Sequence, residues 1–284
     1  MAVRLSTFTR DGLTFEVVDA GPLDGAVVVL LHGFPQDATA WDQIAPRLHD
    51  AGYRTLAPDQ RGYSPRARPS GVSSYRFREL VDDVLTMVTE SGVDRAHVVG
   101  HDWGAMVAWA LAADQPETIT SVAALSVPHP SAFRAAALHG QALRSWYMGL
   151  FQVRGLAERV LTPGSWLWSQ FMTGLPASSA EHYAARMSEP GALTGALSWY
   201  RALPSEVRHP SVQIGRVRVP ALYVWGARDP ALGRSAAELT GRFVTGPYRF
   251  EILEDAGHWL PETRAEPVAD LLLEHLAPGR PTLT

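Results

Sequence analysis

Short apolar stretches alternate with helical periodicities over roughly the first half of the chain. Residues 26–31 are apolar at every position, which is typical of a strand buried on both faces of a parallel sheet. The pattern predicts further strands at 13–18, 53–57, 97–99 and Ile119–Leu125. Apolar residues recurring at the helical period predict helices at 41–48, 75–89 and 103–113. This alternation indicates an α/β fold, a mostly parallel sheet with helices on both faces.

The pattern changes between residues 128 and 217, where no strand is predicted. Helical stretches rich in tryptophan and tyrosine are punctuated there by proline and glycine. The α/β alternation then returns, with strands at 221–225 and Tyr248–Leu253, a helix near Ser235 and a closing helix at 264–276.

These patterns predict three segments. Residues 1–128 form the first part of an α/β core, 129–217 form an inserted helical cap, and 218–284 complete the core. Internal repeats and low-complexity tracts are absent from the sequence.

Composition excludes several classes of protein. Of the 284 residues 46% are hydrophobic and 19% charged, which is the composition of a globular protein. The formal net charge is −4, and all 25 basic residues are arginine without forming a block or stripe, so we expect no nucleic-acid partner. The absence of lysine is typical of a GC-rich genome and leads us to expect a bacterial protein.

The chain contains no cysteine, which excludes disulfides, thiolate nucleophiles and cysteine-bound metals. Its first residues lack the apolar segment of a secretory signal. The apolar run at 26–31 is far shorter than the ~20 residues needed to cross a bilayer. We therefore expect a cytoplasmic protein, monomer or homodimer, without membrane insertion.

The strongest local signal is the sequence Gly-His-Asp-Trp-Gly at 100–104, between a predicted strand and a predicted helix. A G-x-Ser-x-G sequence in this context forms a nucleophile elbow, and here aspartate replaces the serine. Flanking glycines permit a sharp turn, and the helix N-terminus stabilises the carboxylate of Asp102. Asp102 is thus a candidate nucleophile. The alternative is a simple helix N-cap, a position that aspartate favours for other reasons.

A second signal, His-Gly-Phe-Pro at 32–35, follows the buried strand at 26–31. Sites in open α/β sheets lie at the carboxyl ends of strands. The backbone N–H groups of Phe34 and Trp103 are candidates for an oxyanion hole, worth about 3 kcal/mol each to a developing negative charge. A plain strand-to-helix turn is the alternative.

Two further strand ends carry an acid and a histidine. Asp229 follows the strand at 221–225, and His258 follows Tyr248–Leu253. The order nucleophile, acid, histidine is that of hydrolases with an α/β core. His258 is the candidate general base and Asp229 the acid that orients it. Asp255 is a rival for Asp229, although it lies too near His258 in sequence to approach its ring easily.

On these motifs the chain resembles, over its whole length, the epoxide hydrolases of the α/β-hydrolase fold. Two segments of the predicted cap add to the resemblance. They are Tyr-Met-Gly-Leu-Phe-Gln at 147–152 and Ser-Trp-Tyr-Arg at 198–201, which look like the family's two ring-opening tyrosine segments. The resemblance implies that Tyr147 and Tyr200 protonate the epoxide oxygen, with Tyr183 as the substitute should one be misassigned. Aromatic packing inside the cap is the alternative.

The resemblance further implies a hydrolase without cofactor or metal that turns a small apolar epoxide and water into a vicinal diol. Asp102 forms an ester with the substrate, and His258, oriented by Asp229, activates the water that cleaves it. We expect an apolar substrate pocket between cap and sheet, lined by Trp103, Trp146, Phe151 and Trp199.

Two alternatives stay open. Haloalkane dehalogenases share the motifs around Asp102, but they need a second halide donor besides Trp103, and the side chain of Phe34 donates nothing. A tryptophan of the cap, at position 146, 166, 168 or 199, could serve as that donor. Haloacetate dehalogenases also resemble the chain but place an arginine at the position of Trp103, so the tryptophan argues against that class. A non-catalytic binding protein on the same fold is the second alternative.

Overall fold

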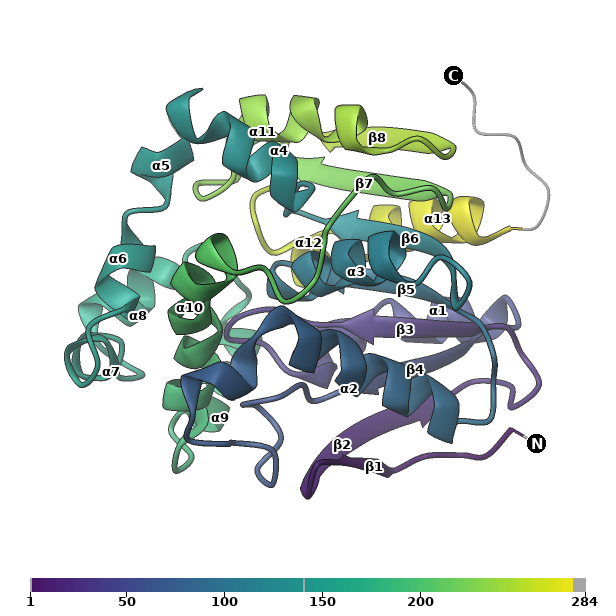
Figure 1. Cartoon of the computed structure of the whole chain (residues 1–284), viewed down its shortest axis with the longest axis horizontal. Coiled ribbons are helices and arrows are strands. Elements are labelled where there is room, and N and C mark those ends of the chain that lie inside the picture. The colour runs from purple at the N-terminus through teal and green to yellow at the C-terminus, as the bar shows by residue number, and fades with distance from the viewer. Residues whose placement is uncertain (1, 140, 278–284) are drawn as a thin grey trace.

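The computed structural model describes residues 2–139 and 141–277, which form one eight-stranded sheet covered by helices (Figure 1). The strands lie in the order β1-β2-β4-β3-β5-β6-β7-β8. Pairings β1–β2 and β2–β4 are antiparallel and all the others are parallel. The strands are β1 Thr7–Arg10, β2 Leu13–Ala20, β3 Val27–Leu31, β4 Arg54–Pro58, β5 Ala96–His101, β6 Ile119–Leu125, β7 Ala221–Gly226 and β8 Tyr248–Leu253. The predicted α/β architecture is therefore confirmed.

Helices cover both faces of this sheet. One core cluster packs α2 (Phe77–Glu90) and α3 (Trp103–Asp114) against one face. A second cluster packs α1 (Ala45–Asp50) and α13 (Ala265–Leu276) against the other. The central strands β3 and β4 are buried along their whole length. β3 is apolar at every position, as burial on both faces favours, whereas β4 begins with the buried Arg54 and Thr55. The remaining core helices are η1 Ala38–Trp41, η2 Val72–Tyr75, α11 Arg234–Leu239, η4 Thr240–Phe243 and α12 Leu260–Thr263.

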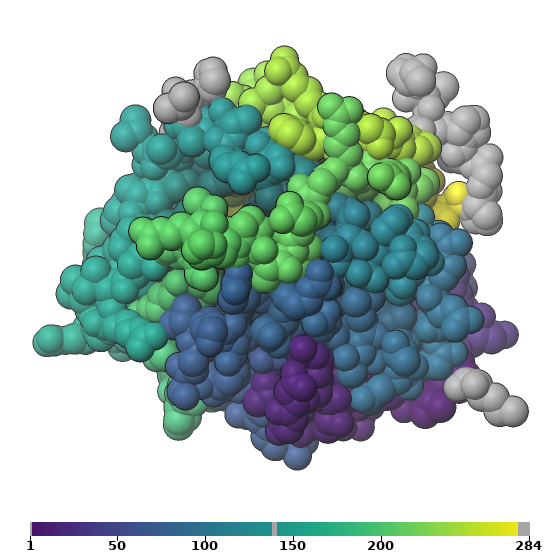
Figure 2. Space-filling view, in the orientation of Figure 1, coloured from purple at the N-terminus to yellow at the C-terminus, as the bar shows by residue number. Residues whose placement is uncertain are grey.

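Between β6 and β7 the described residues contain helices but no strand. Figure 1 shows most of these helices gathered beside the carboxyl ends of the parallel strands. In the space-filling view the green segment that leads back to β7 crosses the visible face next to α2 (Figure 2). The helices are α4 Pro130–Ala135, η3 Ala136–His139, α5 Gln141–Arg144, α6 Tyr147–Phe151, α7 Leu156–Val160, α8 Trp166–Phe171, α9 Ala177–Met187 and α10 Ala192–Arg208.

Two local predictions were wrong or incomplete. The helix expected at 41–48 is divided into η1 and α1, because Pro46 lies in the first turn of α1 and cannot continue a preceding helix. Strand β1 was not predicted. It forms a hairpin with β2 through Asp11 and Gly12, both at positive φ, which is the turn that an Asp-Gly pair favours.

Candidate active site

Asp102 occupies the sharp turn between β5 and α3, with φ +50° and ψ −119°. Glycine is needed at positions 100 and 104 because other backbone atoms lie too close to leave room for a side chain. A Cβ on Gly100 would lie 2.2 Å from the carbonyl oxygen of Gly104, and one on Gly104 would lie 2.1 Å from that of Leu31. Sequence and structure thus agree on a strained turn that presents one aspartate at the carboxyl edge of the sheet.

The carboxylate of Asp102 has two partners. The N–H of Phe34 donates to Oδ1 at 2.9 Å, and Nε2 of His258 lies 3.6 Å from Oδ2. A Cβ on Gly33 would lie 2.4 Å from that of Asp102, so only glycine allows this approach. Burial raises the pKa of Asp102, but its pairing with the charge of His258, with His101 and the Phe34 N–H, holds it below its usual value. Asp102 is therefore a carboxylate.

Asp229 orients His258. Its Oδ2 lies 2.8 Å from Nδ1 of His258, while its Oδ1 accepts the N–H groups of Ala231 and Leu232 at 2.8 and 3.0 Å. Burial lowers the pKa of His258, but the charge and hydrogen bond of Asp229, with the pairing to Asp102, raise it to about 10. The free protein therefore holds His258 as an imidazolium between two carboxylates.

The rival acid is excluded by position. Asp255 is exposed, and its carboxylate pairs with Arg264 at 2.8 Å rather than with His258. Of the two acids that sequence offered, the structure brings only Asp229 to the histidine ring.

Two tyrosines of the insertion face the same cavity as Asp102. Tyr147 begins α6 and Tyr200 lies within α10, and their ring centroids are 6.2 Å apart. Tyr200 also packs edge-on against Trp103, at 4.8 Å. Burial, and next the charge of Asp102, raise the pKa of both phenols well above the ordinary value, so both keep their protons. Both can donate a hydrogen bond but cannot readily ionise while Asp102 is charged.

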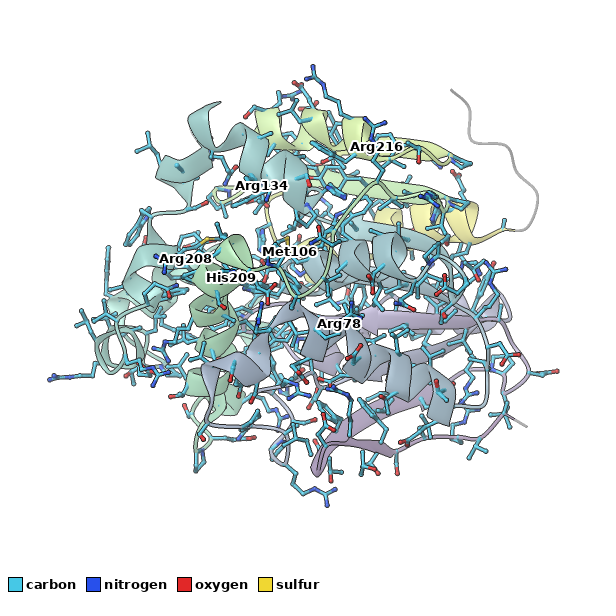
Figure 3. All side chains as sticks on the ribbon, in the orientation of Figure 1. Arg78, Met106, Arg134, Arg208, His209 and Arg216 are labelled. Atoms are coloured by element: carbon cyan, nitrogen blue, oxygen red, sulfur yellow. The ribbon has the colours of Figure 1, made fainter. Side chains whose placement is uncertain are left out.

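A cavity of about 550 Å³ lies over this group, and its lining is mostly apolar. Figure 3 labels two of its lining residues, Met106 and Arg134. Sequence reasoning missed Met106, although it stands one helical turn after Asp102 on α3 and so shares its face. The lining comes chiefly from α3, α4, the segment around α5 and α6, and α10 with the loop that follows it, together with Phe77 at the start of α2. It includes Trp103, Phe133, Met148, Leu203, Val212 and Ile214.

Three residues expected in the pocket lie elsewhere. Trp146 is 60% exposed and is not part of the lining. Phe151 is fully buried behind Tyr147, with ring centroids 5.4 Å apart. The indole of Trp199 donates to the carbonyl oxygen of Arg61 at 2.8 Å. Of the expected pocket residues, only Trp103 lines the cavity.

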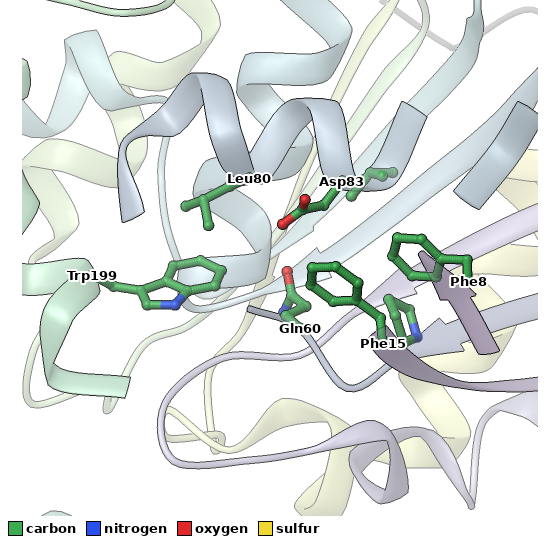
Figure 4. Close-up of a pocket in the computed structure, with 8 residues that line it drawn as sticks. Phe8, Phe15, Gln60, Leu80, Asp83 and Trp199 are labelled. Atoms are coloured by element: carbon green, nitrogen blue, oxygen red, sulfur yellow. The ribbon is translucent and has the colours of Figure 1, made fainter. Parts of the chain in front are cut away.

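Trp199 borders a second, much smaller cavity between β2 and α2 (Figure 4). Its volume is about 10 Å³, room for roughly one water molecule. Asp83 on its wall is paired with Arg61 at 2.7 Å. This space is part of the core and offers no room for a substrate.

The substitute tyrosine, Tyr183, is also removed from the cavity. Its hydroxyl donates to Oε1 of Glu262, on α12, at 2.9 Å. Among residues 2–139 and 141–277 there is no group of three or more histidine, aspartate or glutamate side chains arranged to hold a metal ion. The same residues include no helix with the length and hydropathy needed to cross a membrane.

The chain is similar to known proteins over nearly its whole length. A sequence profile described as alpha/beta hydrolase fold matches residues 26–265. The AB hydrolase superfamily protein YfhM of Bacillus subtilis is 36% identical, over 96% of this chain and 98% of that protein. Epoxide hydrolase A of Mycobacterium tuberculosis is 33% identical, over 94% of this chain and 95% of that protein. The crystal structure of epoxide hydrolase A from Mycobacterium thermoresistibile aligns with a TM-score of 0.80 and 29% identity, covering 97% and 98% of the two chains.

Proposed function

This chain belongs to the epoxide hydrolases of the α/β-hydrolase family, and we propose that it opens apolar epoxides to vicinal diols through an ester on Asp102. The observation that carries the proposal is the arrangement around one cavity: Asp102 is paired with His258, and the phenols of Tyr147 and Tyr200 line the same space. A carboxylate nucleophile opposite two neutral phenols suits a reaction in which a carbon is attacked while an oxygen leaves.

In the first step a carboxylate oxygen of Asp102 attacks an epoxide carbon, and the carbon–oxygen bond of the ring breaks. An alkoxide is a poor leaving group, so one of Tyr147 and Tyr200 transfers its proton to the ring oxygen while the other donates a hydrogen bond. The products are a hydroxyalkyl ester of Asp102 and a phenolate.

Ester formation changes the charge around His258. While Asp102 is a carboxylate, it helps to raise the pKa of His258 to about 10. The ester is neutral, so it no longer supports the imidazolium. His258 gives up its proton, which converts the phenolate back to a phenol, and His258 becomes a base. Formation of the ester thus converts His258 into the base that the second step needs.

In the second step His258 takes a proton from water, and the hydroxide adds to the ester carbon of Asp102. The N–H of Phe34 already points at this carboxyl group, and that of Trp103, the first residue of α3, has no acceptor within its own helix. Together they would stabilise the oxyanion by about 3 kcal/mol each. Collapse releases the diol, whose leaving oxygen takes the proton of His258. The carboxyl proton of Asp102 then passes to His258 and restores the imidazolium.

We also propose that the helical insertion, residues 129–217, acts as the cap of this site. It contributes Tyr147, Tyr200 and most of the apolar lining, whereas the core contributes Asp102 to the lining and the His258 that pairs with it. The haloalkane dehalogenase alternative has less support. Among the described residues that line the cavity Trp103 is the sole tryptophan, so no second indole is placed to hold a halide.

The test is one turnover in oxygen-18 water with enzyme in excess over styrene oxide. Because water attacks the ester carbon, the label should be found in Asp102 and the first diol should carry none. Label that passes directly into the diol would rule out the covalent ester. A parallel assay with a bromoalkane distinguishes the alternative: release of bromide with an inert epoxide would favour the dehalogenase.

A further inference from the structure

The residue before the nucleophile, His101, is fully buried and has two close partners. Its Nε2 lies 2.9 Å from the backbone carbonyl oxygen of His258, and its Nδ1 lies 2.8 Å from Oε1 of Gln36. A carbonyl oxygen only accepts hydrogen bonds, so Nε2 must carry a hydrogen. Whether Nδ1 also carries one depends on the orientation of the Gln36 amide.

The Gln36 amide is held by two neighbours. Its Oε1 accepts the N–H of Gly33 at 2.9 Å, and its Nε2 donates to Oε1 of Glu262 at 2.7 Å. Turning the amide over would set its NH₂ group against the N–H of Gly33, donor against donor. Oε1 of Gln36 therefore faces His101 as an acceptor, and both ring nitrogens of His101 need a hydrogen.

Glu262, on α12, offers no place for a proton. Its Oε1 accepts from both Gln36 and the hydroxyl of Tyr183, at 2.7 and 2.9 Å. Its Oε2 is buried and has no hydrogen-bond partner, so a proton there would point at no acceptor. The donors around Glu262 therefore favour the carboxylate.

We propose that Glu262, Gln36 and His101 form a buried relay in which the carboxylate of Glu262 balances an imidazolium at His101. Glu262 is then a positioning residue of the proposed hydrolysis, acting through the charge of His101 on the catalytic His258. The inference rests on the proposed function only for this catalytic consequence, and the charge state itself is independent of it.

Burial opposes this charge separation. Burial, and next the cation of His258, lower the pKa of His101 to about 4, and burial raises the pKa of Glu262. A neutral His101, however, would leave two acceptors facing each other 2.8 Å apart, at its Nδ1 and at Oε1 of Gln36. Unsatisfied polar contacts are most costly where water is excluded, so the hydrogen bonds favour the ion pair.

The consequence concerns the proton on His258, whose ring centroid lies 5.0 Å from that of His101. His258 is faced by Asp102 and Asp229, which favour its imidazolium, and by His101, which opposes it when charged. Glu262 in turn is faced by Tyr183 and by the charge of His258. After Asp102 becomes an ester, the charge of His101 helps His258 to lose its proton and act as base.

The direct test is nuclear magnetic resonance of protein labelled with nitrogen-15 at histidine, with His101 assigned through its contacts with Gln36. At neutral pH both nitrogens of His101 should show the shifts of protonated nitrogen. In Glu262→Gln, which keeps an oxygen for Gln36 and Tyr183, one nitrogen should lose its hydrogen. A single protonated nitrogen in the unmodified protein would overturn the proposal, whatever the fate of the variant.

The kinetic test separates the two half-reactions in single turnovers. In Glu262→Gln the formation of the ester should change by no more than about twofold. Its hydrolysis at neutral pH should slow about tenfold, with the acidic limb of its pH profile about one unit higher, because His258 keeps its proton longer. Glu266→Gln, the same substitution on an exposed glutamate at the start of α13, is the control and should leave that limb in place.

Two results would overturn the catalytic role. One is an equal slowing of both half-reactions in Glu262→Gln with an unmoved limb, which is the behaviour of a purely structural residue. The other is a shift of the limb in Glu266→Gln as large as that in Glu262→Gln. A protein that forms no ester on Asp102 at all would instead contradict the proposed function, and the charge of His101 would still be decided by its nitrogen shifts.

Discussion

Nε2 of His258 lies 3.6 Å from Oδ2 of Asp102, a distance of ion pairing that exceeds an ordinary hydrogen bond. The same histidine is bound at 2.8 Å by Asp229. The imidazolium is thus held between one fixed acid and a second acid that the proposed reaction converts to an ester. This unequal pairing links the charge of the proposed nucleophile to the basicity of the histidine.

Replacing Asp102 by asparagine should therefore lower the pKa of His258 from its present value of about 10. Removal of a negative charge takes away part of what favours the imidazolium, while Asp229 remains. The titration of His258, followed by nuclear magnetic resonance, measures the change, and epoxide turnover should be lost. An unchanged titration would show that Asp229 alone holds the proton.

Replacing His258 by glutamine should trap the ester on Asp102. Glutamine cannot accept the proton of water, so the second step stops while the first continues. Mass spectrometry of the intact protein should find an increase equal to the mass of the epoxide. His209→Gln, on an exposed histidine outside the cavity lining, is the matched control and should accumulate no adduct. Full turnover by His258→Gln would assign the base to another group.

Removing a phenol from the cavity should slow ester formation more than ester hydrolysis. Tyr147→Phe and Tyr200→Phe each keep the ring and its packing but lose a donor, and general acid catalysis is worth about 10²- to 10⁴-fold. Rapid mixing with excess enzyme measures the formation of the ester. Tyr183→Phe, whose hydroxyl faces Glu262, should leave that rate unchanged. A larger loss in Tyr183→Phe than in the other two variants would show that Tyr147 and Tyr200 are not the proton donors.

The turn around Asp102 was predictable from sequence because its geometry depends on residue type alone. A strand, two glycines with no room for a Cβ and a helix N-terminus leave few other conformations. The α/β alternation likewise predicted the parallel strands, because short crossovers between them are right-handed and return to the same sheet. Strand β1 is too short to show a clear alternation of its own, although the Asp-Gly turn that joins it to β2 is a strong hairpin signal.

The direction of cavity side chains was not predictable in the same way. Tyr200 faces the cavity, whereas its neighbour Trp199 faces the carbonyl of Arg61. Tyr147 lines the cavity, whereas Trp146 next to it is largely exposed. Adjacent residues on a helix diverge by about 100°, so the rotation of each helix against the core decides which aromatic ring faces a substrate. That rotation depends on tertiary packing that no local pattern records.

The fold should also depend on an ion pair far from the site, between Asp19 on β2 and Arg54 on β4. Both side chains are fully buried, and two hydrogen bonds of 2.9 and 2.5 Å join them. Burial raises the pKa of Asp19, but the hydrogen bonds from Arg54, Leu5 and Arg4 hold it below its usual value. The carboxylate is thus favoured by folding.

Asp19→Asn should therefore lower the free energy of unfolding by roughly 3–5 kcal/mol, since it leaves the buried charge of Arg54 uncompensated. In the unmodified protein this contribution is complete above the pKa of aspartate in the unfolded chain, about 3.9. It is lost as the pH falls through the lower pKa of the folded state, so the difference between the two proteins should shrink in acid. Urea unfolding over a range of pH measures both effects, with the exposed Asp24→Asn as control. A pH-independent difference, or an equal loss in Asp24→Asn, would mean that this ion pair does not stabilise the sheet.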